Sequence, residues 1–252
     1  MKKIALITGA SSGIGAATAR EFAQNGIDLI LCGRREDRLL SIKEELSAKV
    51  NVIHAVFDVR NEKDVIESLN GIPESFKAID ILVNNAGNAH GLGPIHEGSS
   101  EDWDMMMDAN VKGLLYVTRY VSKLMVSRKC GHIINVSSIA GKETYQNGTV
   151  YCGSKAAVES ISKGLRLELV PHGIKVTNIA PGAVDTEFSM VRFKNDKNKA
   201  DLVYRGFEPL LAKDIANSIW YCINQPSHVQ IADLTIFASA QSAATSIHRE
   251  DT

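Results

Sequence analysis

Short runs of apolar residues recur along the whole chain, separated by longer segments with the spacing of amphipathic helices. Within each run the apolar residues stand at successive positions rather than at every second one, which is typical of parallel strands buried on both faces. The predicted strands span Ile4–Ile7, Leu29–Cys32, Val50–Phe57, Ile79–Asn84, His132–Val136, Lys175–Ile179 and Leu234–Phe237.

Segments with helical periodicity fill the spaces between these runs. The predicted helices span Ile14–Gln24, Arg35–Ala48, Glu62–Leu69, Trp103–Arg128, Tyr151–Val170 and Lys213–Asn224. Alternation of strands and helices predicts a doubly wound α/β sandwich, in which a parallel sheet lies between two layers of helices. Because no repeat or linker interrupts the alternation, we expect a single domain over residues 1–252.

One segment departs from the alternation. Residues 182–211 are charged and only weakly periodic, and they follow a predicted strand. Long connections in a compact domain are usually functional, and ligands of parallel α/β sheets bind beyond the carboxyl ends of the strands. We therefore predict that residues 182–211 form a lid over a substrate site.

Composition narrows the classes of function. The chain is 44% apolar and 23% charged, and its 28 Lys and Arg against 29 Asp and Glu give a formal net charge of −1. A near-neutral chain has no general attraction for nucleic acid or for anionic lipid. No apolar run approaches the roughly 20 residues of a membrane helix, and the first residues do not form a secretory signal. We expect a cytoplasmic protein that acts on a small molecule.

The residue types that bind metals form no recognisable motif. The cysteines are widely spaced and include no C-x-x-C pair, and the histidines include no H-E-x-x-H sequence. We therefore expect reduced thiols and no metal site. The four cysteines are Cys32, Cys130, Cys152 and Cys222.

The first predicted strand runs into a glycine-rich loop that a helix follows. The loop reads Thr-Gly-Ala-Ser-Ser-Gly-Ile-Gly over Thr8–Gly15. Glycines permit positive φ and close approach of the backbone to a ligand, and a helix N-terminus attracts phosphate. Glycines alone could form a structural turn, but their place between the first strand and the first helix favours a dinucleotide site. The predicted cofactor-binding residues here are Gly9, Ser11, Ser12, Gly13, Ile14 and Gly15.

The end of the second predicted strand indicates which dinucleotide binds. An acidic residue here would favour NAD, whereas this chain has Arg34 and Arg35, whose guanidinium groups suit a 2′-phosphate. We therefore predict NADP(H) as the cofactor and interpret Arg38 as part of a solvated charge cluster. Further candidates for the nucleotide groove, which follow the third and fourth strands, are Asp58, Val59 and Asn85.

A tyrosine and a lysine one helical turn apart are candidates for proton transfer. Tyr151 and Lys155 stand at the start of a predicted helix, so both side chains lie on one face. A neighbouring ammonium lowers the pKa of a tyrosine, which can then protonate a carbonyl oxygen or deprotonate an alcohol. Ser138, at the end of the fifth predicted strand, can hydrogen-bond the same oxygen. Its alternative role is to cap a turn, which the adjacent Ser137 could do instead.

In this order and spacing, the glycine loop, Asn84–Gly87, Ser138 and Tyr151–Lys155 resemble the motifs of the short-chain dehydrogenase/reductase family. The resemblance covers almost the whole chain. It implies a Rossmann-like fold with a seven-stranded parallel sheet, usually assembled as a homotetramer. It also implies a reaction in which hydride passes between the nicotinamide and a substrate carbon, while a tyrosine donates or accepts the proton.

The resemblance further implies individual roles. Tyr151 corresponds to the acid and base, Ser138 to the residue that orients the substrate, and Lys155 to the lysine that bonds the nicotinamide ribose. Asn110 corresponds to the fourth catalytic residue, which holds a water that links Lys155 to solvent. The contacts implied near the nicotinamide are Pro181, Gly182, Val184 and Thr186.

The substrate depends on the variable segments. Ala78–Gly87, Pro181–Phe193 and Gln230–Gln241 are similar to segments of the family's NADP-dependent 3-hydroxy acid dehydrogenases, which implies substrates such as L-serine, L-allo-threonine or 3-hydroxypropionate. The carboxylate of such a substrate needs a cation, and Arg192 is the candidate, unless it is a surface arginine beside Lys194. The alternatives are a reductase of diketones, aldehydes, sugars or 3-oxoacyl groups, and a non-catalytic protein that senses NADPH.

Overall fold

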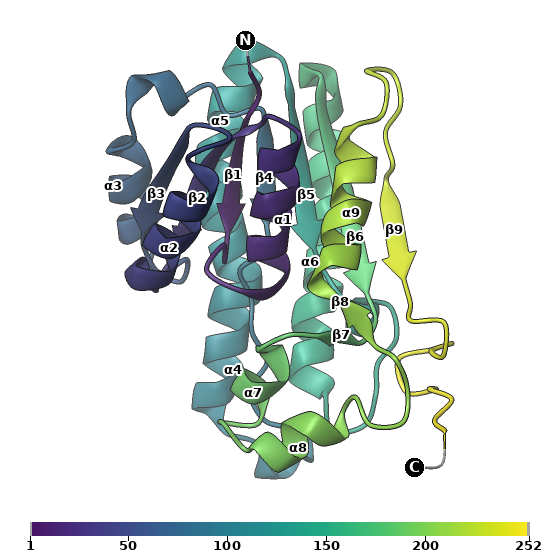
Figure 1. The fold of residues 1–252 in the computed structure, drawn as a ribbon. Helices are drawn as coiled ribbons and strands as arrows, with labels where there is room; N and C mark the ends of the chain where they lie inside the picture. Colours follow the sequence, from purple (N-terminus) through teal and green to yellow (C-terminus); the bar gives the residue numbers. More distant parts are fainter. Residues whose placement is uncertain (1, 251–252) are drawn as a thin grey trace.

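The centre of the molecule is a parallel sheet, described together with the rest of residues 2–250 by a computed structural model (Figure 1). The seven strands stand in the order β3-β2-β1-β4-β5-β6-β9, and every neighbouring pair is parallel. Their bounds are Ile4–Thr8 (β1), Asp28–Gly33 (β2), Val52–Val56 (β3), Ile81–Asn84 (β4), Gly131–Val136 (β5), Ile174–Pro181 (β6) and Asp233–Ile236 (β9). Each predicted strand overlaps one of these, and the predicted Rossmann-like, doubly wound sandwich is confirmed.

Successive residues of a strand pack against opposite layers of helices, which explains the continuous apolar runs. In β1, Ala5 and Ile7 belong to one hydrophobic core and Ile4 and Leu6 to the other. Helices of the first core are α1 (Gly13–Gln24), α2 (Glu36–Leu46) and α9 (Ala212–Ile223). Helices of the second are α3 (Glu62–Asn70), α5 (Leu114–Arg128) and α6 (Thr149–Leu169).

The order of the strands reverses between β1 and β4. From β1 the chain moves outward through β2 to β3, and it then returns to place β4 on the other side of β1. The helices that follow β1 and β4 therefore lie on opposite faces, which leaves a crevice at the carboxyl ends of these two strands. The fold thus provides a binding position where the glycine loop after β1 meets Asn85 after β4.

The helix predicted over Trp103–Arg128 is interrupted in the structure. Helix α4 (Ser100–Met107) and α5 are joined by a π-helical segment, Asp108–Gly113, whose backbone hydrogen bonds span five residues instead of four. The prediction of one continuous α-helix was wrong because a single wide turn hardly alters the apolar spacing. Such segments often occur at functional sites, and this one contains the buried Asn110.

Residues 182–211 contain more regular structure than their sequence predicts. In chain order they form β7 (Val184–Asp185), α7 (Phe188–Arg192), α8 (Lys197–Leu202) and β8 (Leu210–Leu211). Strands β7 and β8 pair in parallel as a separate two-stranded sheet. Helices of one or two turns are too short to give a periodic signal. Figure 1 shows α7 and α8 beyond the carboxyl ends of the central strands.

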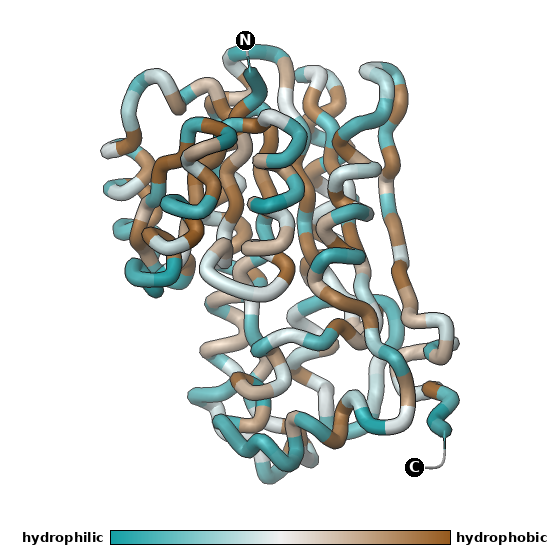
Figure 2. Tube along the Cα trace, in the orientation of Figure 1, coloured by the Kyte–Doolittle hydropathy of each residue, from teal (hydrophilic) through white to brown (hydrophobic). Residues whose placement is uncertain are grey.

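Hydrophobic residues concentrate in the central strands, whereas α8 is largely hydrophilic (Figure 2). Within residues 2–250, no helix is long and apolar enough to cross a membrane. The four cysteines are free thiols, and three of them are buried.

Candidate active site

The glycine loop has the close backbone packing that its sequence predicts. Gly9 and Gly13 adopt φ of 65° and 51°, a region that side chains rarely enter. A Cβ at Gly15 would lie 2.3 Å from the Gly9 carbonyl oxygen and 2.6 Å from Asn85 Nδ2. Gly13, Ile14 and Gly15 form the first turn of α1, so its free N–H groups open toward the crevice.

Asn85 lies directly against this loop. Its Nδ2 donates to the carbonyl oxygens of Thr8 at 3.0 Å and Gly9 at 3.3 Å. The end of β4 is thereby bonded to the end of β1, and the structure brings these two predicted parts of the nucleotide groove together.

Arg35 connects the glycine loop to the lid. Its guanidinium donates to Ser11 Oγ at 3.1 Å and to Ser12 Oγ at 2.6 Å, and its Nη1 pairs with Glu187 Oε2 at 2.9 Å. The other oxygen of Glu187 pairs with Arg38 Nη1 at 2.5 Å. Hydrogen bonds from these two arginines hold the pKa of Glu187 below its usual value, although burial opposes the shift.

The interpretation of Arg38 as part of a solvated charge cluster therefore missed its partner. Glu187 follows Arg38 by 149 positions, so nothing in the local sequence could have indicated the pair. Arg35 and Arg38 thus form a cluster of two arginines with Glu187 at the start of α2.

Asp58 is surrounded by arginines rather than standing alone in the groove. Its carboxylate pairs with Arg60 at 2.6 Å and with Arg34 at 3.6 Å. Burial raises the pKa of Asp58, but hydrogen bonds from Arg60 outweigh burial and lower it. Val59 packs against the π-helical segment, where a Cβ on Gly113 would lie 2.8 Å from Val59 Cγ2.

Tyr151 and Lys155 lie in the first turns of α6, and both side chains are buried. Lys155 Nζ donates to the Val136 carbonyl oxygen at 3.0 Å, which directs it to the end of β5. Burial lowers the pKa of Lys155 to about 8, while the charge of Glu159 opposes the decrease. Lys155 is therefore still mostly charged at neutral pH, but its pKa lies much closer to neutral pH than that of an ordinary lysine.

The balance of charges at Tyr151 differs from the sequence-based expectation. Burial raises the pKa of the Tyr151 phenol, and the neighbouring Tyr145 adds to the increase. Hydrogen bonding with Ser138 and the charge of Arg192 act in the lowering direction. Lys155, which was expected to lower this pKa, is not among its main causes, and burial outweighs the charge of Arg192 from the lid.

Of the two serines after β5, Ser138 rather than Ser137 caps the turn that follows. Ser138 caps the turn Ile139–Gly141, where its Oγ accepts from Ala140 N at 3.1 Å and lies 3.5 Å from the Pro181 carbonyl oxygen. Ser137 is buried, and its hydroxyl donates to the Lys155 carbonyl oxygen at 3.3 Å. Capping by Ser138 fixes its hydroxyl at the carboxyl end of β5, close enough to Tyr151 to act on the phenol.

Asn110 is held on both sides of its amide group. Its Oδ1 accepts from Asn88 N at 2.8 Å, and its Nδ2 donates to the Asn88 carbonyl oxygen at 2.8 Å and to Ser154 Oγ at 3.0 Å. A Cβ on Gly87 would lie 2.9 Å from Asn110 Oδ1 and 3.5 Å from Lys155 Nζ. The structure thus brings Asn110 and Lys155 together around Gly87. Asn88 and Ser154 were not predicted, although Ser154 lies within the Tyr151–Lys155 motif and Asn88 directly follows Asn84–Gly87.

The lid contributes an aromatic ring and a cation to the surroundings of Tyr151. The ring centroids of Phe188 and Tyr151 are 5.6 Å apart. The guanidinium carbon of Arg192 lies 5.5 Å from the ring centroid of Tyr151 and 5.5 Å from that of Tyr145. Nε and Nη2 of Arg192 are buried and have no hydrogen-bond partner among residues 2–250. Buried donors of this kind are rare and need an explanation.

The start of the lid is fixed to the glycine loop and to the C-terminal segment. A Cβ on Gly13 would lie 3.4 Å from Thr186, and Ala183 N donates to Gln241 Oε1 at 2.8 Å. A Cβ on Gly182 would lie 2.2 Å from that same oxygen, so a side chain there would displace Gln241 from this hydrogen bond. The Val184 carbonyl oxygen accepts from the Tyr204 hydroxyl at 2.8 Å. Gln241 was not predicted, because only the folded chain places it beside Gly182.

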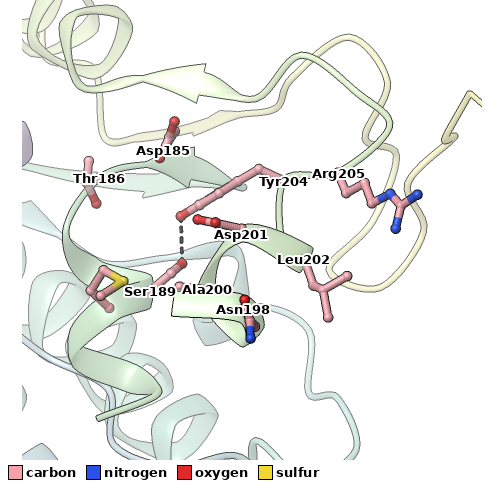
Figure 3. Close-up of a pocket in the computed structure, with 10 residues that line it drawn as sticks. Asp185, Thr186, Ser189, Asn198, Ala200, Asp201, Leu202, Tyr204 and Arg205 are labelled. Carbon is pink, nitrogen blue, oxygen red and sulfur yellow. Dashed lines mark hydrogen bonds between the residues drawn. The ribbon is translucent and has the colours of Figure 1, made fainter. Parts of the chain in front are cut away.

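Two cavities open in and beside the lid. One of about 620 Å³ lies inside it, where the Ser189 and Tyr204 hydroxyls meet at 2.7 Å (Figure 3). The other, of about 680 Å³, has Arg192, Lys194 and Lys199 on its wall. Tyr151 and Lys155 line neither cavity. Within residues 2–250, no three His, Cys, Asp or Glu side chains are grouped as a metal site would require.

Similarity to known proteins agrees with this arrangement. The family model described as short chain dehydrogenase matches residues 3–197. The NADP-dependent 3-hydroxy acid dehydrogenase YdfG of Salmonella typhi is 45% identical over 248 residues, which are 98% of this chain and 99% of that protein. Sulfoacetaldehyde reductase 2 of Chromohalobacter salexigens is 43% identical over 242 residues, which are 96% of each chain. A solved closed form of serine dehydrogenase complexed with NADP+ has a TM-score of 0.92 at 43% identity, covering 98% of this chain and 100% of that one.

Proposed function

The chain belongs to the short chain dehydrogenase family, and from that premise we propose that its substrates are small 3-hydroxy acids and their 3-oxo counterparts. Family membership and the NADP-dependent relatives confirm the predicted coarser activity, an NADP-dependent oxidoreductase that acts on CH–OH groups. The proposed substrates are L-serine, L-allo-threonine and 3-hydroxypropionate. The observation that carries the choice is the guanidinium of Arg192 beside Tyr151.

Arg192 supplies what the carboxylate of a 3-hydroxy acid requires. Its buried Nε and Nη2 lack partners among the described residues, and a carboxylate accepts two parallel hydrogen bonds from a guanidinium. In a 3-hydroxy acid the carboxylate is two carbons from the reacting carbon. Arg192 would therefore hold the carboxylate while the hydroxyl group faces Tyr151.

The proposed chemistry uses residues at the carboxyl ends of β4 and β5. NADPH, when bound, supplies the hydride. Tyr151 donates the proton to the carbonyl oxygen in reduction and removes it from the alcohol in oxidation. Ser138 donates a hydrogen bond to that oxygen and stabilises its developing charge. Lys155 provides a positive charge that favours the Tyr151 phenolate, and Asn110 holds the loop that packs against Lys155.

The residues around the crevice fit a dinucleotide with a 2′-phosphate. At Gly15 a side chain would collide with the Gly9 backbone, and the free N–H groups at the start of α1 suit a pyrophosphate. Arg34 and Arg35 stand at the end of β2, where the adenosine ribose of a dinucleotide lies in this fold. The other residues proposed to contact the cofactor are Gly9, Ser11, Ser12, Gly13, Ile14, Asp58, Val59, Asn85, Tyr151, Lys155, Pro181, Gly182, Val184 and Thr186.

The proposal extends to the lid and the assembly. Residues 182–211 would cover the substrate, since Phe188 and Arg192 of α7 already contact the ring of Tyr151. The expected assembly is a homotetramer, as the resemblance to the family implies. The expected location is the cytoplasm, where thiols such as the exposed Cys130 stay reduced.

One other substrate class has specific support. A sulfonate is an anion that a guanidinium binds much as it binds a carboxylate, and one relative is a sulfoacetaldehyde reductase at 43% identity. A small sulfonated aldehyde is therefore the second candidate.

The test is NADP+ reduction measured on a panel of L-serine, L-allo-threonine, 3-hydroxypropionate, a sulfonated alcohol, a sugar and a simple neutral alcohol. NAD+ serves as the cofactor control. We expect turnover only of the alcohols that carry a carboxylate or a sulfonate group, with kcat/KM highest for those that carry a carboxylate. Faster turnover of neutral alcohols would reject the anion site, and NADPH binding without any turnover would favour the NADPH sensor.

A further inference from the structure

A pair of acidic residues, one buried and one exposed, lies behind Lys155, outside the groups used so far. Glu159 stands one helical turn after Lys155 on α6 and is only 6% exposed. One of its oxygens accepts from Asn178 Nδ2 at 2.7 Å, and the other is 3.2 Å from Lys142 Nζ. Asn178 belongs to β6, and Lys142 follows the turn that Ser138 caps. Glu159 is thus fixed from two neighbouring elements.

Asp233 is the second acid of this cluster. Its carboxylate is 2.7 Å from Lys142 Nζ and accepts from Asn178 Nδ2 at 2.9 Å. Lys142 and Asn178 therefore each bridge both acids. Asp233, the first residue of β9, is the outer acid, with a side chain that is 36% exposed against 8% for Glu159. Together with Lys155 the cluster holds two cations and two anions, of which Lys155 and Glu159 are the buried ones.

We propose that Glu159 is a positioning residue for the reaction, whose carboxylate, held by Lys142 and Asn178, keeps Lys155 in its charged ammonium form. The inference rests on the proposed role of Lys155 in that reaction. An ammonium can donate to ribose hydroxyls and stabilise a phenolate, whereas a neutral amine does not supply the charge.

Burial makes the charged form of Lys155 costly, and its immediate neighbours offer little compensation. Nζ donates to a neutral carbonyl, that of Val136, and the nearby Asn110 is also neutral. Residues at i and i+4 of a helix lie on one face, so the Glu159 carboxylate is the closest anion on the helix of Lys155. Its charge opposes the effect of burial on the pKa of Lys155.

Ionisable groups on the elements packed against α6 have partners of their own, such as Asp102 of α4, which pairs with Lys194 at 3.0 Å. Asp108 of the π-helical segment pairs with Lys112 at 2.8 Å, and Asp233 pairs with Lys142. Lys175 of β6 donates to backbone carbonyls at Pro226 and Val229. On α6 itself, the Tyr151 phenol is neutral at neutral pH because burial raises its pKa. Glu159 therefore carries the compensating charge.

The experiment compares Glu159→Gln with Asp233→Asn. The two variants remove equal charge from one hydrogen-bond cluster, but Asp233 is the acid farther from Lys155. NADPH dissociation constants are measured by fluorescence titration of each folded variant from pH 6 to 10. In parallel, lysine labelled with 13C at Cε reports the titration of Lys155 in the protein without cofactor, assigned with Lys155→Arg.

We expect Glu159→Gln to shift the Lys155 titration, and the pH at which NADPH binding weakens, downward by about one unit. Asp233→Asn should leave the Lys155 titration and the pH dependence of NADPH binding as in the wild type. Glu159→Asp, which keeps the charge, should shift these two quantities less than Glu159→Gln does. Equal shifts in the Gln and Asn variants, or no shift in either, would overturn the inference. These experiments measure NADPH binding and lysine titration, not substrate turnover. If the protein oxidised no 3-hydroxy acid, the proposed substrate class would be wrong, but this result would still test the role of Glu159.

Discussion

The guanidinium of Arg192 lies over the ring of Tyr151, with 5.5 Å between the guanidinium carbon and the ring centroid. Arg192 ends α7 in the lid, whereas Tyr151 lies in the first turn of α6 beside the sheet. A cation at this distance is attracted to the face of an aromatic ring. In the proposed function, substrate recognition and proton transfer would thus meet at this pair of side chains, one from the lid and one from α6.

Replacement of Tyr151 by phenylalanine tests the proton donor directly. Tyr151→Phe removes the hydroxyl and keeps the ring that packs against Phe188, so the fold should be retained. We expect loss of turnover with NADPH affinity close to that of the wild type, measured by steady-state kinetics and fluorescence titration. Near-normal turnover would contradict the acid and base role.

Arg192 variants test the anion site. We expect Arg192→Ala to raise KM for L-serine by about 10- to 100-fold, the value of a lost charged hydrogen bond. Arg192→Lys should recover only part of this, because an ammonium lacks the two parallel donors. Lys194→Ala, at an exposed lysine paired with Asp102, is the matched control and should leave KM unchanged. An unchanged KM for L-serine in Arg192→Ala would remove the basis for the proposed substrate class.

Arg35 is expected to set the preference for NADPH over NADH. Arg35→Ala should weaken NADPH binding by about 10- to 100-fold and change NADH binding little, since only NADPH carries the 2′-phosphate. Arg20→Ala, which breaks a surface pair with Glu45, serves as the control for the loss of one arginine. If both dinucleotides lost affinity equally, Arg35 would act on the loop through Ser11 and Ser12 rather than on the phosphate.

Two glycine-to-alanine substitutions test whether a glycine is required by close packing or only lowers helix stability. Gly15→Ala should abolish NADPH binding or folding, because its Cβ would lie 2.3 Å from the Gly9 carbonyl oxygen. Gly164→Ala, within α6, meets no atom within 4 Å. It should raise the free energy of unfolding by about 0.5–1 kcal/mol, since alanine favours the helix. Denaturant titration gives the free energy of unfolding of both variants. Equal free energies of unfolding in Gly15→Ala and Gly164→Ala would contradict the prediction.

Lys155 should leave a signature in the dependence of stability on pH. Its pKa is about 8 in the folded protein, against the ordinary lysine value of 10.5 that applies to the unfolded chain, so between these values the unfolded chain binds the extra proton. Stability therefore rises with pH in this window, by about 2 kcal/mol between pH 8 and pH 9.5 for an isolated group. We expect Lys155→Met to lose this increase, measured as the difference from the wild type in denaturant titrations. A parallel pH dependence in both proteins would show that other groups dominate.

Much of the fold could be predicted because its signals are local. Buried parallel strands such as β1 are apolar at successive positions, and a glycine loop between strand and helix identifies the nucleotide crevice. Tyr151 and Lys155 could be paired because helical spacing places them on one face. The π-helical segment around Asn110 was missed since one wide turn leaves the periodicity nearly intact.

The parts that could not be predicted depend on contacts between distant segments. Glu187 is paired with Arg35 across 152 positions, and Gln241 bonds Ala183 across 58. Both residues lie in segments that resemble those of the family's 3-hydroxy acid dehydrogenases, but nothing in these segments indicates which residues they contact. Glu187 follows β6 and Gln241 follows β9, and only the folded sheet brings the carboxyl ends of these strands near the partners of the two residues.

By itself, the sequence determined the layer architecture, the cofactor crevice and the pairing of Tyr151 with Lys155, because these follow from spacing within a strand, a loop or a helical turn. The reaction was implied by the resemblance of these motifs to a known family. The tertiary structure decided the electrostatic setting of that chemistry. Burial raises the pKa of Tyr151 and lowers that of Lys155, and the compensating charges come from Arg192 in the lid and Glu159 behind the site. Burial and the distance between charges exist only once the chain has folded, so a sequence pattern cannot carry them.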